Sequence, residues 1–296
     1  MNIESNVIDT ALIFEGGGMR AAYTSAVVTT LLGEGIFFDY VAGISAGSSN
    51  LANYVSRDPV RAHRSFVDFS ADPQFGSWGT WAQGKGLFNA EYIYEQAYFP
   101  DGALPFDTEM FMANPARIRI GAFDVSAGQT VYWSRKDVKG AADLMTRVRA
   151  SSSMPFFMPP TMIGSSMYID GALGAGGGIP LPIAIKDGYE KFFVVLSREK
   201  SYMKQSHAGM DLALKAWFHT YPTIAEGIAR RPSEYNATRY QLMELQRQGR
   251  AYLFYPEHMT LTNRTRDVSM LQAAYDMGLN QARQELPRWK EFLNLA

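Results

Sequence analysis

The sequence predicts an α/β protein, a three-layer sandwich in which a mainly parallel central sheet lies between helices. The apolar run at residues 10–14 and the predicted strand at 38–42 are each followed by glycines and then by a segment with helical spacing. A strand, helix, strand, helix order is typical of parallel sheets whose crossover helices cover both faces. The length of 296 residues, 47 % of them hydrophobic, allows one large domain with a sizeable core.

The first strand is the apolar run at 10–14, which ends at Glu15-Gly16-Gly17-Gly18. Glycines directly after an apolar run predict a buried strand that meets a tight turn. Apolar residues then recur at near-helical spacing over 20–32, which predicts a helix. The second strand, 38–42, leads into a glycine-containing turn at 43–47, and a second helix follows.

The middle of the chain is less regular, because residues 72–115 are rich in aromatic residues, glycine and proline. Strands return at about 117–124 and 129–134. A helix over about 140–149 stops at the segment 150–160, since the prolines of that segment remove hydrogen-bond donors and fix φ.

Three further strands are predicted in the second half of the chain. A strand near 166–169 leads into Asp170-Gly171-Ala172, and residues 191–197 form the clearest strand of the chain. Beyond residue 208 the pattern is mostly helical, with one short strand at 251–255.

Charge and cysteine content exclude several classes of function. The chain carries 28 basic and 29 acidic residues, so it lacks the basic surplus of a nucleic-acid binder. Cysteine is absent, which excludes disulfides, thiolate metal sites and cysteine nucleophiles. We expect no nucleic-acid partner, no metal and no cofactor.

The amino terminus and the hydropathy pattern bear on location. The first nine residues have neither a positive region nor an apolar region of the kind that secretory signals carry. No stretch approaches the roughly 18 apolar residues that a membrane-spanning helix needs. We expect a cytoplasmic protein that contacts membranes peripherally without crossing them.

Ser45 is the candidate nucleophile. Gly43-x-Ser45-x-Gly47 lies between a predicted strand and a predicted helix, which is the context of a nucleophile elbow. In such a turn the glycines remove side-chain clashes and leave the serine hydroxyl exposed beside a helix amino end. The alternative is a turn of small residues that serves only to begin the helix.

The loop Gly16-Gly17-Gly18 is the candidate oxyanion hole. Carboxyl ends of neighbouring parallel strands lie side by side, so these amides can point into the space above Ser45 and hold an oxyanion. Arg20 adds a positive charge suited to a phosphate or to anchoring the loop. Gly16-x-Gly18-x-x-Ala21 also matches a dinucleotide-binding fingerprint. That motif requires an acidic residue at the end of the next strand, whereas Asp39 lies at the beginning of that strand.

Asp170 is a better candidate base than any histidine. The four histidines, His63, His207, His219 and His258, lack neighbouring residues that single them out, and His219 is expected on an amphipathic helix. Asp170 ends a strand and precedes Gly171-Ala172, so we expect its carboxylate at the sheet edge that carries Ser45. Burial in an apolar pocket would raise the pKa of this carboxyl and make it a stronger base. The alternative for Asp170 is a residue that only caps a turn.

Together these motifs resemble the patatin-like phospholipase family. The matching segments are Glu15-Gly16-Gly17-Gly18-Met19-Arg20, Gly43-Ile44-Ser45-Ala46-Gly47 and Asp170-Gly171-Ala172, and the serine- and proline-rich segment 149–160 also fits. The resemblance covers roughly residues 10–200. It implies a single patatin-like domain over 1–296, with the motifs at about 10–200 and a mostly helical part at about 201–296.

The resemblance also implies a mechanism without histidine or metal. Ser45 would be the nucleophile, Asp170 the base, and the glycine loop at 16–18 the oxyanion hole, while Arg20 positions that loop or meets phosphate. The sequence departs from the family at Ala21, where glycine is common. The function expected from the resemblance is hydrolysis of fatty-acyl esters of phospholipids, lysophospholipids or related lipids through an acyl-enzyme.

Two other functions stay open at this point. One is a soluble carboxylesterase or thioesterase that acts on a non-lipid ester, and the other is a non-catalytic lipid-binding protein that keeps the fold. For the acyl chain, the apolar residues Met154, Phe156 and Phe157 are the candidate substrate-binding side chains. The aromatic stretch at 75–111 is expected to face the lipid as a pocket wall or lid, or else to belong to the core.

Overall fold

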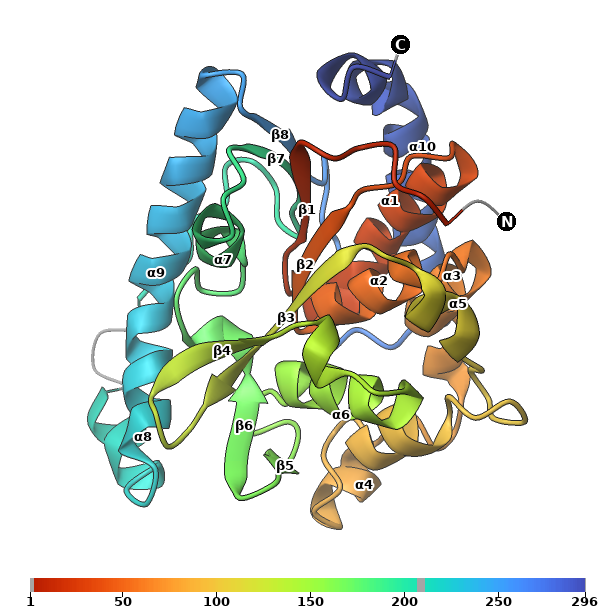
Figure 1. Cartoon of the computed structure of the whole chain (residues 1–296). Coiled ribbons are helices and arrows are strands. Elements are labelled where there is room, and N and C mark those ends of the chain that lie inside the picture. Colours follow the sequence, from red (N-terminus) through yellow and green to blue (C-terminus); the bar gives the residue numbers. More distant parts are fainter. Residues whose placement is uncertain (1–2, 207–210, 296) are drawn as a thin grey trace.

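Eight strands form one central sheet in the computed structural model of the chain, which describes residues 3–206 and 211–295 (Figure 1). The order across the sheet is β5-β6-β3-β2-β1-β7-β8, and β4 pairs with β3 beside this path. The strands are β1 (Thr10–Phe14), β2 (Tyr40–Ile44), β3 (Arg117–Asp124), β4 (Gln129–Trp133), β5 (Thr161–Ile163), β6 (Ser166–Asp170), β7 (Lys191–Val195) and β8 (Ala251–Phe254).

The centre of the sheet is parallel and one edge is antiparallel. Strands β3, β2, β1, β7 and β8 run parallel to their neighbours in that order. Strands β4, β6 and β5 add the antiparallel part. Because β1 and β2 are parallel, with Phe14 paired to Gly43, the loops that follow these two strands emerge at the same edge.

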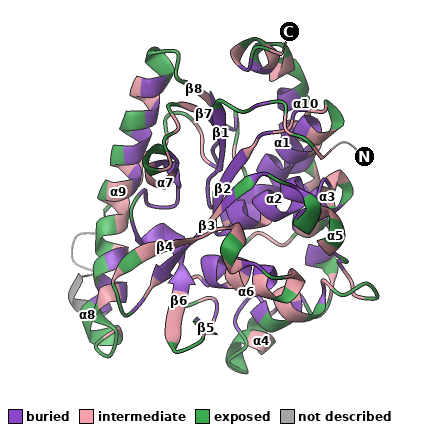
Figure 2. Ribbon diagram, in the orientation of Figure 1, coloured by how far each residue is buried: buried purple, intermediate pink, exposed green. Residues whose placement is uncertain are grey.

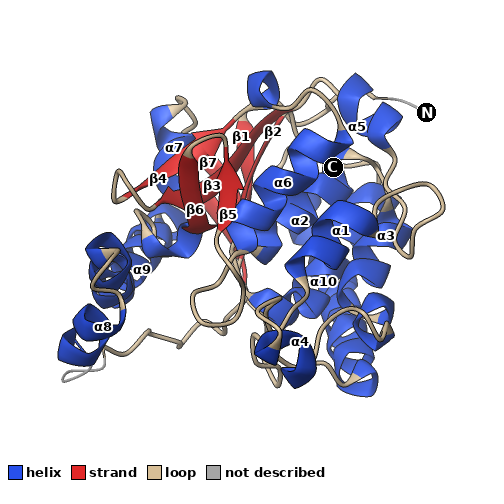
Figure 3. Cartoon of the chain, turned by 90° about the horizontal axis from the view of Figure 1, so that it is seen from below, coloured by secondary structure: helices blue, strands red, loops and turns tan. Residues whose placement is uncertain are grey.

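Helices cover both faces of this sheet, as the view in Figure 3 shows. One face carries α1 (Ala21–Gly33), α2 (Ala46–Val55), α3 (Pro59–Phe66), α6 (Ala141–Ser152) and α10 (Val268–Phe292). The other face carries α7 (Leu181–Lys186) and α9 (Pro222–Arg247). Shorter helices are α4 (Trp78–Ala82), α5 (Thr108–Ala113) and α8 (Asp211–Trp217). The arrangement confirms the predicted α/β class with a mainly parallel central sheet.

The core follows these layers. Figure 2 shows buried residues concentrated on the central strands and on α1 and α2. A large apolar cluster lies between the sheet and the α1, α2 and α10 layer, and Trp289 of α10 is fully buried in it. A second cluster lies beneath α7 and α9 and includes Tyr235 and Leu242. Within the described residues, no helix has both the length and the apolar character to span a bilayer.

Most predicted elements occur, with shifts at their ends. Helix α6 continues to Ser152, three residues beyond the predicted end, because the first proline of the segment comes only at residue 155. The second strand begins at Tyr40, and Phe38 forms only an isolated bridge with Val7. The prediction missed the strand β5 and the helices α3, α4, α5 and α7, each of eight residues or fewer.

Candidate active site

Ser45 occupies a sharp turn between β2 and α2. Its backbone has φ of 55° and ψ of −131°, a strained conformation that is rare for a residue with a side chain. The flanking glycines are required by close packing. A Cβ at Gly43 would lie 2.3 Å from the Gly47 carbonyl oxygen, and a Cβ at Gly47 would lie 2.3 Å from the Phe14 carbonyl oxygen. The turn therefore has the geometry of a nucleophile elbow.

The Ser45 hydroxyl donates a hydrogen bond of 2.8 Å to Oδ2 of Asp170, a residue 125 positions away in the chain. Both residues are buried, with exposed fractions of 5 % and 6 %. The Ala172 amide donates to the other carboxylate oxygen, Oδ1, at 2.9 Å. Asp170 is thus fixed by two donors, one of which is the serine hydroxyl.

Asp170 reaches Ser45 from an antiparallel strand. It lies at the sheet edge that carries Ser45, as predicted, although β6, which it ends, is antiparallel to β3. Strand β3 continues past the end of β2, so that Ile44 pairs with Gly121 while Asp170 pairs with the next residue, Ala122. The long β3 therefore brings the end of β6 level with the residue that follows β2.

Burial raises the pKa of Asp170 above its ordinary value of 3.8. The nearby positive charge of Arg231 and the hydrogen bonds from Ala172 and Ser45 act in the opposite direction. Desolvation is the largest of these influences, so the carboxylate is a stronger base than an exposed aspartate.

Ser151 and Ser153 hold the two candidate residues from the end of α6. The Ser45 amide donates to Ser151 Oγ at 2.8 Å, and Ser151 in turn donates to the Gly121 carbonyl at 2.5 Å. The Asp170 amide donates to the Ser153 carbonyl at 3.0 Å. The sequence carried a signal for these residues in the segment 149–160, but no role for its serines followed from the sequence.

The glycine loop lies beside Ser45, where an added Cβ on Gly16 would be 3.0 Å from the Ser45 Cβ. The Gly16 amide already donates to the Gly178 carbonyl at 3.0 Å, so the prediction that it is a free oxyanion donor is not supported by this geometry. Within residues 3–206 and 211–295, no acceptor is found for the amides of Gly17 and Gly18. Gly18 has φ of 55°, and a Cβ there would meet the Asn263 carbonyl oxygen at 2.5 Å.

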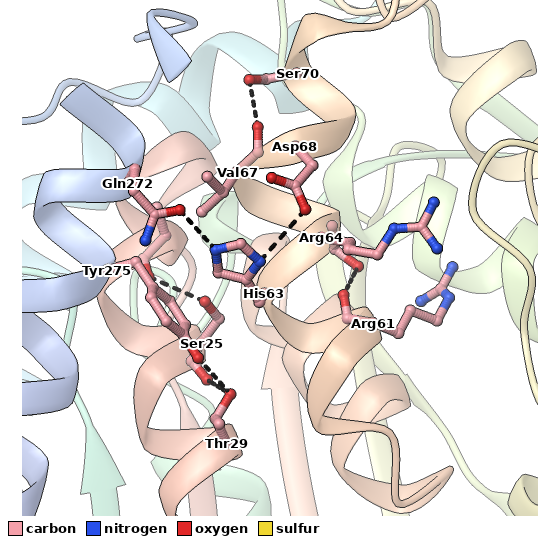
Figure 4. A network of polar contacts seen from close by, with 12 residues as sticks. Ser25, Thr29, Arg61, His63, Arg64, Val67, Asp68, Ser70, Gln272 and Tyr275 are labelled. Atoms are coloured by element: carbon pink, nitrogen blue, oxygen red, sulfur yellow. Dashed lines mark hydrogen bonds and ion pairs between the residues drawn. The ribbon is translucent and has the colours of Figure 1, made fainter. Parts of the chain in front are cut away.

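His63 is engaged in a contact between helices, away from Ser45. Figure 4 shows its ring between Gln272 of α10 and Asp68, with Nε2 2.9 Å from Gln272 Oε1 and Nδ1 3.4 Å from Asp68 Oδ2. The ring also meets Tyr275 edge-on, with 4.4 Å between centroids. This histidine connects α3 to α10.

The other histidines bring no imidazole to Ser45 within the described residues. His219 is exposed in the turn after α8, which corrects the prediction that it lies on a helix. His258 is exposed in the loop after β8, beside Glu257 and Tyr255. His207 lies outside the residues that the structure describes.

An apolar cavity opens on one side of Ser45. Its walls come from the aromatic stretch and from α2, α3 and α6, with Arg61 of α3 as its charged residue, and Met154 and Met158 contribute to it. Aromatic and aliphatic side chains dominate the lining: Phe66, Phe69, Phe75, Phe88, Ile93, Tyr94, Leu104, Met145 and Val148. Part of the stretch at 75–111 therefore faces the cavity that contains the candidate nucleophile.

A second cavity on the other side of Ser45 is polar and basic. Asp170, the glycine loop and Asn263 line it, together with the cationic side chains of Arg20, Arg198, Lys204 and Arg231. Met154 lines both cavities, whereas Phe156 and Phe157 line only this polar one. Arg20 is nine-tenths buried, and burial lowers its pKa to about 10.

Neither cavity contains a recognisable metal site. Among residues 3–206 and 211–295, no group of three or more histidine, aspartate or glutamate side chains is placed to hold a metal ion. The expectation of a mechanism without metal or cofactor remains a prediction.

Residues 12–185 match the family model described as patatin-like phospholipase. Residues 221–294 match a second model, described as a domain of unknown function (DUF6363). The first match includes Ser45, Asp170 and the glycine loop, while the second covers α9, β8 and α10.

Two individual proteins are similar to the chain. It is 24 % identical over 187 residues to the uncharacterized protein YjjU of Escherichia coli K12. The aligned residues cover 62 % of this chain and 51 % of that protein. The chain thus spans about half the length of this curated relative. The solved structure of VipD from Legionella pneumophila matches with a TM-score of 0.50 and 11 % identity, over 97 % of this chain and 67 % of that one. At this identity the likeness shows the fold alone.

Proposed function

Because the chain belongs to the patatin-like phospholipase family, we propose that it is a lipid acyl hydrolase in which Ser45 and Asp170 form the catalytic dyad. The observation that carries this proposal is the 2.8 Å hydrogen bond from the Ser45 hydroxyl to the buried Asp170 carboxylate. We propose as substrates the fatty-acyl esters of phospholipids, lysophospholipids or related lipids. The assignment includes a single domain over 1–296, since β8 and α10 belong to the same sheet and core as the motifs.

In the proposed acylation, Asp170 Oδ2 takes the hydroxyl proton while Ser45 Oγ attacks the carbonyl carbon of the ester. The tetrahedral intermediate collapses when the bond to the alcohol breaks, and Asp170 returns its proton to that leaving oxygen. A water molecule then transfers a proton to Asp170 as it attacks the acyl-enzyme. The fatty acid leaves, and Ser45 regains its proton from Asp170.

The negative charge of the tetrahedral intermediate needs donors that are free in the resting protein. We assign this role to the amides of Gly17 and Gly18. The role that we assign to Gly16 is to let the backbone of the loop approach Ser45 closely, since it has no Cβ. The positive end of α2, which begins directly after Ser45, favours the same charge.

The apolar cavity is the proposed site of the acyl chain. It reaches Ser45 and is walled by aromatic rings, which suit a hydrocarbon chain better than a polar group. Met154 lies where the two cavities meet, so its side chain can contact the substrate next to the ester.

We also propose peripheral membrane contact through an exposed aromatic surface made of Trp78, Trp81, Phe156 and Trp217. Trp78 and Trp217 are 68 % and 72 % exposed, and large apolar residues at such exposure are costly in water. The Trp78 and Trp81 rings lie 6.1 Å apart, Trp81 Nε1 donates to the Phe156 carbonyl at 3.0 Å, and the Phe156 and Trp217 rings lie 5.9 Å apart. Phe156 also lines the basic cavity, so this surface adjoins a route to Ser45.

The proposed function is tested by comparing hydrolysis of short p-nitrophenyl esters and long-chain phospholipids by the wild type and Ser45→Ala. We expect hydrolysis of the phospholipids, and a loss of about 10³-fold or more in Ser45→Ala. Hydrolysis of the short esters alone would favour a non-lipid esterase or thioesterase. Binding of lipid without hydrolysis of either substrate would favour a non-catalytic lipid-binding protein.

A further inference from the structure

Four cationic side chains from distant parts of the chain meet in the basic cavity beside the dyad. Arg20 precedes α1, Arg198 and Lys204 follow β7, and Arg231 belongs to α9. Three of these four lie outside residues 12–185, the segment that matches the phospholipase family model. Arg231 lies in the segment of unknown function.

None of these cations forms an ion pair with a carboxylate of the described residues. Charges further away do act on them: Glu15 attracts Arg20 and Lys204, and Arg231 attracts Asp170. The ion pairs of the described part of the chain involve other basic side chains. Nε of Arg20 is buried without any hydrogen-bond partner there. Burial, and after it the positive charges of Arg231 and Arg20, lowers the pKa of Lys204 to about 7, while the charge of Glu15 acts in the opposite direction.

The segment that carries Arg198 and Lys204 is held firmly by α9. Asn236 makes two hydrogen bonds of 2.9 Å to the backbone of Lys204, one to its amide and one to its carbonyl group. The fully buried Arg239 donates to the carbonyl oxygens of Glu199 at 2.8 Å and Lys200 at 3.0 Å. Arg20 is buried, and the other three cations are half-buried. Like charges held close together oppose folding, so a ligand that neutralises them would be bound favourably.

The position of the basic cavity specifies which part of a lipid it faces. Ser45 lines both cavities, so an ester bond at Ser45 has apolar walls on one side and the cations on the other. An acyl chain in the apolar cavity would leave the alcohol part of the ester, with its headgroup, in the basic one. Asp170 is the carboxylate that lines the basic cavity, and it is engaged by Ser45 and Ala172.

We propose that Arg20, Arg198, Lys204 and Arg231 form a subsite for the phosphate of an anionic headgroup, and that the enzyme prefers lipids whose headgroup lacks a compensating positive charge. This proposal rests on the proposed function. Arginine and lysine make short, charge-assisted hydrogen bonds to phosphate oxygens, and a phosphomonoester offers several such oxygens. A choline headgroup would bring its own cation into a cavity that is already positive. The region of unknown function thereby gains a role in substrate selection.

The test compares kcat/KM for phosphatidic acid and phosphatidylcholine, presented in mixed micelles of a neutral detergent, for the wild type and Arg198→Gln/Lys204→Gln. The control, Lys200→Gln/Arg230→Gln, removes two positive charges from exposed neighbouring positions. We expect the wild type to prefer phosphatidic acid, and the Arg198→Gln/Lys204→Gln variant to lose about tenfold or more of that preference, because each charge-assisted hydrogen bond is worth at least that factor. Melting temperatures identify any variant that fails to fold.

The proposal is overturned if the wild type has no preference for phosphatidic acid, or if Arg198→Gln/Lys204→Gln and the control keep the same preference.

Titration of Ser45→Ala with inorganic phosphate separates two sources of the anion. Binding that depends on Arg198 and Lys204 would mean that free phosphate also occupies the subsite, and absence of binding would restrict the subsite to lipid headgroups. If Ser45→Ala binds phosphatidic acid micelles through these cations while the wild type hydrolyses no ester, the subsite stands and the proposed function fails.

Discussion

Arg231 and Asp170 line the same cavity, and the positive charge of Arg231 lowers the pKa of the Asp170 carboxyl while burial raises it. Burial is the larger influence, so the Asp170 pKa lies above its ordinary value of 3.8. A base must be deprotonated to accept the Ser45 proton, so activity should rise with pH as Asp170 ionises. In the proposed dyad, Arg231 of α9 would therefore help to set the pH range of activity.

The first prediction is that Arg231→Gln moves the acidic limb of the pH profile to higher pH. Loss of the positive charge removes the largest influence that opposes burial, so the pKa of Asp170 rises further. The measurement is kcat/KM against pH for a neutral p-nitrophenyl ester, which has no headgroup for the cations to bind. Arg230→Gln, an exposed neighbour on the same helix, is the control and should keep the wild-type profile. A downward shift, or the same profile in both variants, would contradict this account.

The second prediction concerns the histidines. His63→Ala should lower the free energy of unfolding by about 1–2 kcal/mol, since the hydrogen bond to Gln272 and the ring contact with Tyr275 are lost. Its kcat/KM should stay within about twofold of wild type, whereas loss of a general base costs about 10²-fold or more. The same activity is expected when His207, His219 or His258 is replaced. Chemical denaturation and ester hydrolysis measure the two effects, and any single histidine variant as inactive as Ser45→Ala would refute the dyad.

Local sequence patterns were enough to predict the pair Ser45 and Asp170. The glycines at 43 and 47 are required by contacts within the elbow and with the neighbouring strand, so this turn can be recognised from the sequence. The strand-turn-helix context and the Asp-Gly end of β6 are local features too. These local features did not indicate that β6 pairs antiparallel with the extended end of β3.

Features that depend on packing between distant segments were not predictable in this way. The amide of Gly16 is engaged by the Gly178 carbonyl, a partner that no local pattern identifies. The cations of the basic cavity come from three separate segments of the chain, and a net charge of −1 gives no sign of such a cluster. The strand β5 was missed because three residues are too few for a visible alternation of apolar and polar side chains.

The third prediction places the acyl chain. Ala52 of α2 is buried at the wall of the apolar cavity, so Ala52→Leu should fill part of it. We expect kcat/KM for p-nitrophenyl palmitate to fall by about tenfold relative to the butyrate ester, as methylene groups displaced from an apolar pocket cost about that much. Ala127→Leu adds the same atoms at an exposed turn and serves as the control. An unchanged ratio of the two esters, in a variant with a wild-type melting temperature, would place the acyl chain elsewhere.

The fourth prediction concerns the membrane. Trp78→Ala/Trp217→Ala should weaken partitioning onto phospholipid vesicles by about tenfold, because two large exposed aromatic side chains are removed. Hydrolysis of a short water-soluble ester should change little, as neither tryptophan lines the cavities at Ser45. Tyr240→Ala, which removes an exposed aromatic residue from α9, is the control in the same sedimentation assay. Equal partitioning of all three proteins would argue against this aromatic surface as the contact.

The most direct test of the dyad is the site and rate of reaction with a fluorophosphonate probe, read by mass spectrometry. The probe forms a bond to an activated serine oxygen and releases fluoride, so it reports the nucleophile independently of any lipid. We predict one adduct, on Ser45, that forms at least about 10²-fold more slowly in Asp170→Asn and at the wild-type rate in His63→Ala. An adduct on another residue, or an Asp170→Asn protein that reacts as fast as the wild type, would contradict the assignment.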